Sequence, residues 1–173
     1  ADQQLQDRGM PHPSLVCVPT GVGSLLQAAL AHYRGGRARP GTAVLSAEPE
    51  VAACMAPSLA AGRAVTVTTG ATVMAGLNCG TPSSLAWPYI LGGLDAAVAV
   101  TERADVQAAL DLAELGVAAG PCGAASLAAA RLALTGSDAA SRREHLGVGP
   151  DSVVLLVVTE GSDANPVPGL DEL

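Results

Sequence analysis

Lysine and phenylalanine are missing from this sequence, and aromatic residues are scarce. All nine basic residues are arginines, and Tyr33, Trp87 and Tyr89 are the full aromatic set, so the core must be built from alanine, valine and leucine. The apolar runs are well short of the roughly 20 residues that a membrane span needs. The first residues do not have the pattern of a signal peptide. A net charge of −7 argues against a nucleic-acid partner, which requires a basic face.

The length and composition predict a folded α/β domain. The chain has 173 residues, of which 49% are hydrophobic and 14% charged, and these values are typical of a globular protein with a real core. Cys17, Cys54, Cys79 and Cys122 are far apart and form no C-x-x-C pair, so the sequence predicts no metal site. Reduced thiols are the simplest interpretation, and they favour a cytoplasmic location.

Short apolar runs alternate with helical patterns along the chain. The predicted strands are Leu15–Val18, Ala43–Leu45, a weaker Val65–Thr68, Ala96–Val100 and Val153–Val158. The predicted helices are Val22–Arg34, Pro49–Ala61, Glu102–Leu115, Gly123–Leu134 and Arg142–Leu146, with Thr101 capping the third and a capping box at 141–144 starting the last. Arg34 to Gly41 is predicted to be a surface loop. This alternation predicts an α/β fold with a largely parallel sheet flanked by helices.

The stretch "VPTGVGSLLQAAL", Val18 to Leu30, combines a strand, a glycine loop and a helix start. Unpaired N–H groups of a first helical turn, together with the helix dipole, make an anion site. Three interpretations are open: a dinucleotide fingerprint with Glu48 as the ribose acid, a tight turn without ligand, or a cradle for one phosphate. The dinucleotide motif fits only in part, because Leu26 stands where its third small residue belongs. A single phosphate on Gly21 to Ser24 fits best.

Four further segments follow the glycine loop in order. They read "VLSAEPEVAACMAPSLAAGRAVT", "TVMAGLNCGTPSSLAW", "GPCGAASLAAARLAL" and "VVLLVVTEGSDANP". Together they resemble the C-terminal part of the fold-type-II pyridoxal-phosphate enzymes, the tryptophan synthase β superfamily. Within that group, "MAGLNCGTPSSLAWPYILGGLDAAVAV" and "VVTEGSD" are most similar to diaminopropionate ammonia-lyase.

This resemblance implies pyridoxal 5′-phosphate as the cofactor and assigns the binding residues. The glycine loop of the family binds the cofactor phosphate, which implies Gly21, Val22, Gly23 and Ser24 here. The family places a Ser or Thr hydroxyl on the pyridine nitrogen after the last strand, which implies Thr159. Asn78, in the "GLNCG" segment beside the ring, would donate to a cofactor or substrate oxygen, although a loop Asn more often bonds its own backbone. Many relatives carry a Glu where this chain has Gly120.

The main departure from the family is an absent lysine. The family holds the cofactor as a Schiff base on a lysine, and arginine cannot replace it because its guanidinium stays protonated. No catalytic residue is therefore assigned. The expected domains are a helical tail at 1–13, an incomplete cofactor-binding α/β domain at 14–166 and a C-terminal tail at 167–173.

Three functions are open at this point. The first is a fragment of a lyase that converts 2,3-diaminopropionate to pyruvate and ammonia, inactive alone. The second is the same portion of a threonine or serine dehydratase-like enzyme. The third is a non-catalytic module that binds a phosphorylated ligand or a partner. The expected partners are an amino-acid substrate in the complete enzyme and either a second copy or the missing N-terminal half. Neither nucleic acid nor a membrane is expected.

Overall fold

A computed structural model describes residues 1–35 and 41–173. Its helices and strands follow the chain in the order α1 (Asp2–Asp7), β1 (Leu15–Pro19), α2 (Ser24–Arg34), β2 (Ala43–Pro49), η1 (Glu50–Ala52), α3 (Met55–Ala61), η2 (Ala75–Leu77), α4 (Trp87–Gly93), β3 (Ala96–Val100), α5 (Glu102–Glu114), α6 (Pro121–Leu134), α7 (Ala139–His145) and β4 (Val154–Leu156). The predicted surface loop at Arg34 to Gly41 lies largely outside the described residues.

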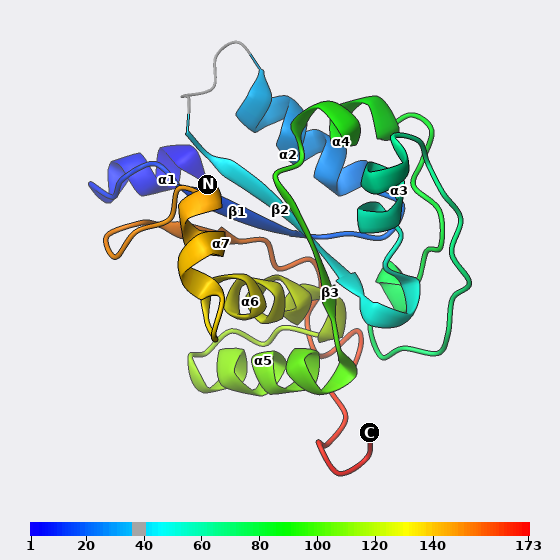
Figure 1. The fold of residues 1–173 in the computed structure, drawn as a ribbon. Helices are drawn as coiled ribbons and strands as arrows, with labels where there is room; N and C mark the ends of the chain where they lie inside the picture. The colour runs from blue at the N-terminus through cyan, green and yellow to red at the C-terminus, as the bar shows by residue number, and fades with distance from the viewer. Residues whose placement is uncertain (36–40) are drawn as a thin grey trace.

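The described strands form one parallel sheet in the order β3-β2-β1-β4. The predicted α/β fold with a parallel sheet is therefore confirmed. Helices α2 and α4 cover one face of the sheet, and α5 and α6 cover the other (Figure 1). Since all strands run the same way, their carboxyl ends meet at one edge, which is where ligands bind in open α/β sheets.

The central strand β1 is buried on both faces, as its unbroken apolar sequence predicts. Val16 and Val18 pack with Leu26 and Ile90 on the α2 side. Leu15 and Cys17 alternate to the opposite face and pack in the cluster that contains the alanines of α6. Small side chains let α6 approach the sheet closely. This close approach explains how the core is well packed with so few aromatic residues.

One predicted strand and one predicted helix start are wrong. Val65–Thr68 is not a strand, because its backbone is tied to the rest of the protein by single contacts, such as Val67 N–H donating to Gly80 O at 2.8 Å. The capping box at 141–144 does not start a helix either. Helix α7 begins earlier, at Ala139, and follows Asp138 without a side-chain cap.

The predicted helix Pro49–Ala61 is divided in two. Pro49 ends β2, the short helix η1 follows, and α3 starts anew at Met55. The break arises because the Glu48 carboxylate accepts hydrogen bonds from Cys54 N at 2.9 Å and Met55 N at 3.1 Å, which caps a new helix start. Helix α4 was not predicted, since Gly92 and Gly93 weaken its helical pattern.

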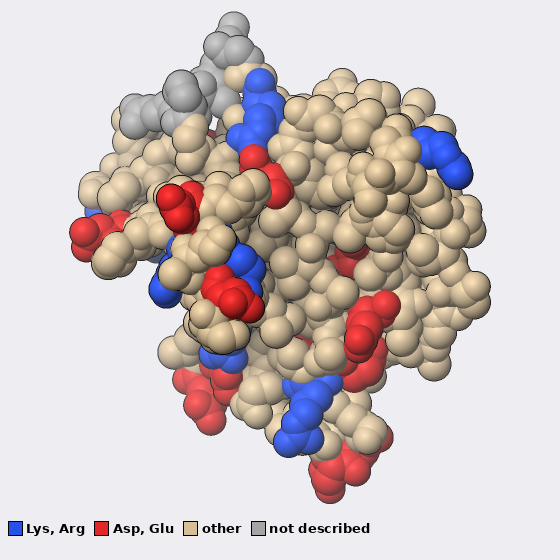
Figure 2. Space-filling model, in the orientation of Figure 1, with Lys and Arg blue, Asp and Glu red and all other residues tan. Residues whose placement is uncertain are grey.

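Charge is unevenly distributed over the surface. Figure 2 shows few charged side chains over α3 and α4, whereas Asp, Glu and Arg gather over α5 and α7. Among the described residues, no helix combines the length and the apolar character that crossing a bilayer requires.

Candidate functional site

The loop that follows β1 is held in one conformation by its glycines. Gly23 is the N-cap residue of α2 and has φ of 99°, a left-handed backbone that favours glycine. A Cβ atom at Gly23 would lie 2.8 Å from Ile90 Cδ1, so a side chain has no room there either. Thr20 N–H donates to Ala47 O at 2.8 Å, which anchors the entry to the loop on β2.

Gly21 lets a second loop pack against the first. A Cβ atom at Gly21 would lie 3.2 Å from both Cys79 Sγ and Gly76 O. The segment from Gly76 to Cys79 therefore lies directly against the glycine loop, where its backbone and the Cys79 thiol form a floor. The Val22 carbonyl accepts a hydrogen bond from Ser83 N–H at 2.8 Å and fixes the loop from its other side.

The N-terminus of α2 has free hydrogen-bond donors. No side chain caps this helix, and its first turn contains no acidic residue. The backbone N–H groups of Gly21, Val22, Gly23 and Ser24 donate no hydrogen bond to any residue in 1–35 or 41–173. Four free amides at the positive end of a helix dipole can bind an anion of the size of a phosphate.

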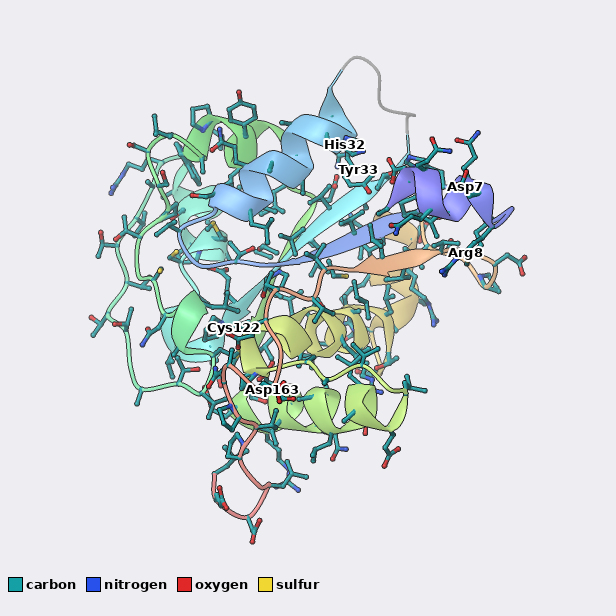
Figure 3. All side chains as sticks on the ribbon, turned by 180° about the vertical axis from the view of Figure 1, so that it is seen from behind. Asp7, Arg8, His32, Tyr33, Cys122 and Asp163 are labelled. Carbon is teal, nitrogen blue, oxygen red and sulfur yellow. The ribbon has the colours of Figure 1, made fainter. Side chains whose placement is uncertain are left out.

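These amides face a cavity of about 320 Å³ at the carboxyl edge of the sheet. Besides the glycine loop, the wall includes Thr159 and Glu160 from the segment after β4 and Cys122 from α6. The cavity is lined by Pro19, Thr20, Gly21, Val22, Gly23, Ser24, Leu25, Gly76, Leu77, Cys79, Cys122, Thr159 and Glu160. Figure 3 shows Cys122 at the start of α6, while His32 and Tyr33 mark the opposite end of α2.

The placement predicted for the glycine loop and Thr159 is confirmed. Gly21 follows β1, which ends at Pro19, and Thr159 follows β4, which ends at Leu156. Strands β1 and β4 are hydrogen-bonded neighbours, with Cys17 paired to Leu156, so the segments after them lie side by side. Thr159 is exposed and lines the same cavity as Gly21 to Ser24. The roles of these residues toward a cofactor stay predictions.

Asn78 is not brought into the cavity wall. Its side-chain amide donates to Gly70 O at 2.9 Å, on the outside of the loop, although its neighbours Leu77 and Cys79 line the cavity. This is the local backbone contact that a loop asparagine usually makes.

Glu48 does not fit the dinucleotide interpretation. Its side chain is 1% exposed, and its carboxylate is engaged by the amides at the start of α3. Burial raises the pKa of Glu48 to about 7, although the amides of Met55 and Cys54 act in the opposite direction. A carboxyl group committed to the core in this way is not available to a ribose hydroxyl.

Several cavity residues were not predicted from the sequence, among them three from α2, α6 and the segment after β4. Leu25, in α2, is 43% exposed and lines the cavity. Cys122 Sγ lies 3.2 Å from where a Cβ atom of Gly76 would be, so the thiol belongs to the cavity floor. Burial, and then the neighbouring Glu160 carboxylate, raise the pKa of the Cys122 thiol to about 12, which keeps it protonated and unreactive. Glu160 is the third of these cavity residues. Its position directly after Thr159 was the only feature of the sequence that could have indicated its place in the cavity.

The fold and the cavity define an α/β protein with a cavity at the carboxyl edge of its sheet whose free amides can accept an anion. A family model described as "Pyridoxal-phosphate dependent enzyme" matches residues 2–160. The chain belongs to this family, and pyridoxal phosphate is its cofactor. The glycine loop fits that cofactor, because its free amides can hold the phosphate and the cavity that they line also includes Thr159.

Solved structures of similar fold agree with this assignment. A threonine deaminase from the organism abbreviated T.th. is 27% identical, with a TM-score of 0.72 over 91% of this chain and 52% of that chain. Maize serine racemase is 27% identical, with a TM-score of 0.72 over 91% of this chain and 47% of that chain. Holo diaminopropionate ammonia lyase from Escherichia coli is 24% identical, with a TM-score of 0.79 over 92% of this chain and 41% of that chain.

The chain spans about half the length, or less, of these solved structures. A search of curated proteins returned no match.

Proposed function

We propose that these 173 residues are the cofactor-binding portion of a pyridoxal-phosphate-dependent lyase that eliminates a β-substituent from a small amino acid. The observation that carries this proposal is the set of free amides from Gly21 to Ser24, which face the same cavity as Thr159. When bound, pyridoxal phosphate supplies an electron-withdrawing ring that stabilises negative charge next to the reacting carbon.

The residues of this chain hold and orient the cofactor. The amides of the glycine loop receive the phosphate, and the exposed Ser24 adds a hydroxyl. A charge-assisted contact of this kind contributes about 1.5–3 kcal/mol, so binding through the phosphate alone is millimolar at best. Thr159, which lines the same cavity, would donate its hydroxyl to the pyridine nitrogen. A neutral hydroxyl leaves that nitrogen without a proton, which suits elimination of a leaving group.

The proposed substrate is 2,3-diaminopropionate, and the products are pyruvate and ammonia. The motifs "MAGLNCGTPSSLAWPYILGGLDAAVAV" and "VVTEGSD" support this assignment. Threonine or serine is the alternative substrate, which the 27% identity to a threonine deaminase and a serine racemase supports. The sequence has no lysine, so the lysine that carries the cofactor comes from outside these residues. The 173 residues alone are therefore inactive, and they work in association with the polypeptide that supplies it, in the cytoplasm.

The test is a spectral titration with pyridoxal phosphate, followed by a pyruvate assay. The 173-residue chain alone should bind weakly, show no absorbance band of a lysine-bound cofactor and release no pyruvate. A longer form that includes a lysine-bearing portion of the family fold should gain the band and the activity together. Comparing 2,3-diaminopropionate with threonine, which yields a 2-keto acid other than pyruvate, and with serine identifies the substrate. Robust turnover by the 173 residues alone would contradict the proposal.

A further inference from the structure

Two long helices begin at the cavity, and only one of them has free donors. Helix α2 has 11 residues and helix α6 has 14. Each start carries partial positive charge. In α6, however, every first-turn donor is used: Pro121 has no N–H, Gly123 N and Ala124 N donate to Gly120 O at 3.0 and 2.9 Å, and Cys122 N donates to Glu160 Oε1 at 2.8 Å. A carboxylate thus already sits at the α6 start.

Glu160 is fixed in this position by several contacts. The Asn165 side-chain amide donates to Glu160 Oε1 at 3.1 Å and to Val73 O at 3.2 Å, which connects Glu160 to the segment that carries Val73. Gly120 N–H donates to the Glu160 carbonyl at 3.1 Å. A Cβ atom at Gly120 would lie 2.9 Å from both Glu160 Cγ and the Gly161 carbonyl oxygen, so the glycine at this position leaves room for the Glu160 side chain and for the backbone that follows it.

A second acid, Asp105, lies within electrostatic reach of Glu160. Asp105, in α5, is 0% exposed, and neither of its carboxyl oxygens has a hydrogen-bond partner among the described residues. Burial raises the pKa of Asp105 to about 8, and the carboxylates of Glu102 and Glu160 contribute to this rise. Because this raised pKa leaves Asp105 largely uncharged near pH 7, an anion at the α6 start would meet repulsion chiefly from the Glu160 carboxylate, whereas the α2 start presents backbone amides and the Ser24 hydroxyl.

We propose that Glu160 is the specificity-determining residue of the cavity. Its carboxylate occupies the anion position of α6, so the cavity accepts one phosphate, at α2, and holds the ligand in a single direction. Ligands with an anionic group at both ends are rejected. This inference rests on the proposed function in one respect, which is that the cofactor phosphate binds at Gly21 to Ser24.

Inorganic phosphate is the probe, and backbone amide shifts in ¹H–¹⁵N NMR spectra are the readout. In the unsubstituted chain, at constant ionic strength, shifts should saturate at Val22 to Ser24 and be absent at Cys122 to Ala124. Glu160→Ala removes the carboxylate and frees the Cys122 amide. A second saturable set of shifts should then appear at Cys122 to Ala124.

Glu160→Gln is the conservative control, because Gln retains an oxygen that accepts from Cys122 N–H and lacks the charge. It should bind phosphate only at Val22 to Ser24, about two- to fivefold more tightly than the parent chain at low salt, because repulsion inside the cavity is removed. The difference should shrink at about 1 M salt, where the Debye length is about 3 Å. A purely structural role for Glu160 would not produce this salt dependence. If Glu160→Ala fails to fold, the affinity of Glu160→Gln for phosphate therefore still tests the role of Glu160.

The outcomes separate the two claims. Phosphate shifts confined to Val22–Ser24 in Glu160→Ala, with unchanged affinity in Glu160→Gln, would overturn the role of Glu160 and leave the α2 site intact. Shifts at Cys122–Ala124 in the parent chain would also overturn it. An absence of shifts at Val22–Ser24 in the parent chain would contradict the proposed function, while new shifts at α6 in Glu160→Ala would still support the inference.

Discussion

The starts of α2 and α6 face one cavity and are built in opposite ways. Helix α2 begins after a glycine loop whose amides are free, and α6 begins at Gly120 with a carboxylate supplied by Glu160, which is distant along the chain. The helix dipole is the same physical feature in both. The two helices differ in whether the protein itself supplies acceptors for the N–H donors of the first turn. This difference determines where a ligand can be bound.

Glycine is required at both starts, for different reasons. At Gly23 the backbone has a positive φ, and the nearest neighbour is a core side chain. At Gly120 the backbone is extended, with φ of −78°, and the space is needed by Glu160. Gly23 keeps a site open for a ligand, and Gly120 leaves space for the Glu160 carboxylate.

The largest effect is expected for Gly23→Ala. Adopting a left-handed backbone costs a non-glycine residue about 1–3 kcal/mol, and crowding Ile90 adds about 1–3 kcal/mol. Urea unfolding should therefore show a large loss of stability, and phosphate binding should be lost. The matched control is Gly62→Ala, where φ is also positive, at 64°, but no atom lies within 4 Å. Equal losses in the two variants would show that the packing against Ile90 does not matter.

A pH-dependent stability is expected on the α6 side. The folded-state pKa values of Asp105 and Glu48 are raised, to about 8 and about 7, so the folded chain binds these protons more tightly than the unfolded chain. The free energy of unfolding should fall as pH rises from about 4 to about 8, by at most about 1.4 kcal/mol per pH unit for each proton. Asp105→Asn should reduce the slope over the whole range from about pH 4 to 8 and remove it between about pH 7 and 8, while Glu48 accounts for the slope that is left below about pH 7. A curve that rises with pH would be inconsistent with these two buried acids.

A smaller effect is expected for Gly120→Ala. The backbone tolerates alanine, but the new methyl group would displace Glu160 from α6, at a cost of about 1–3 kcal/mol. Amide hydrogen exchange at Cys122 should accelerate as its acceptor moves away. Gly92→Ala is the control, because no atom lies within 4 Å of that position in α4. It should gain about 1 kcal/mol from helix propensity. Unchanged exchange at Cys122 in Gly120→Ala would mean that Glu160 does not depend on this glycine.

The smallest effect is expected for Ser24→Ala. Loss of one hydroxyl from a site formed mainly by amides should weaken phosphate binding about two- to fivefold, or about 0.5–1 kcal/mol. Stability should be unchanged, since Ser24 is exposed and its side chain makes no hydrogen bond to a described residue. Ser137→Ala, distant from the cavity, should leave binding unaltered. A complete loss of binding in Ser24→Ala would show that the hydroxyl, rather than the amides, carries the interaction.

The sequence predicted the open helix start better than the closed one. A strand, a glycine loop and an amphipathic helix are consecutive in the chain, so the Gly21–Ser24 site could be recognised locally. The cap on α6 joins residues that are distant in sequence, and only the fold brings Glu160 to Cys122. Leu25 continues the apolar pattern of α2 and yet lines the cavity, because a pattern of apolar residues cannot tell a core face from the lining of an apolar cavity.

The predicted bounds of an element were wrong where a side chain, in place of the backbone, accepts the hydrogen bonds of a helix start. The run from Pro49 to Ala61 reads as one helix, but the Glu48 carboxylate starts a new helix at Met55. Val65–Thr68 has the composition of a strand but pairs with none of the described strands. The sequence contains no signal for this missing partner. By contrast, β3 was predicted with its observed bounds, Ala96–Val100, because it is a short apolar run that ends at the predicted helix cap Thr101.

The most direct test of the account compares pyridoxal phosphate with pyridoxal, which lacks the phosphate, in a ¹H–¹⁵N NMR titration of the chain. The account predicts amide shifts at Gly21 to Ser24 and at Thr159, none at Cys122 to Ala124, and binding of pyridoxal at least about tenfold weaker, because about 1.5–3 kcal/mol of charge-assisted contact is lost. Equal binding of the two ligands, or shifts at the α6 start in place of the α2 start, would contradict it.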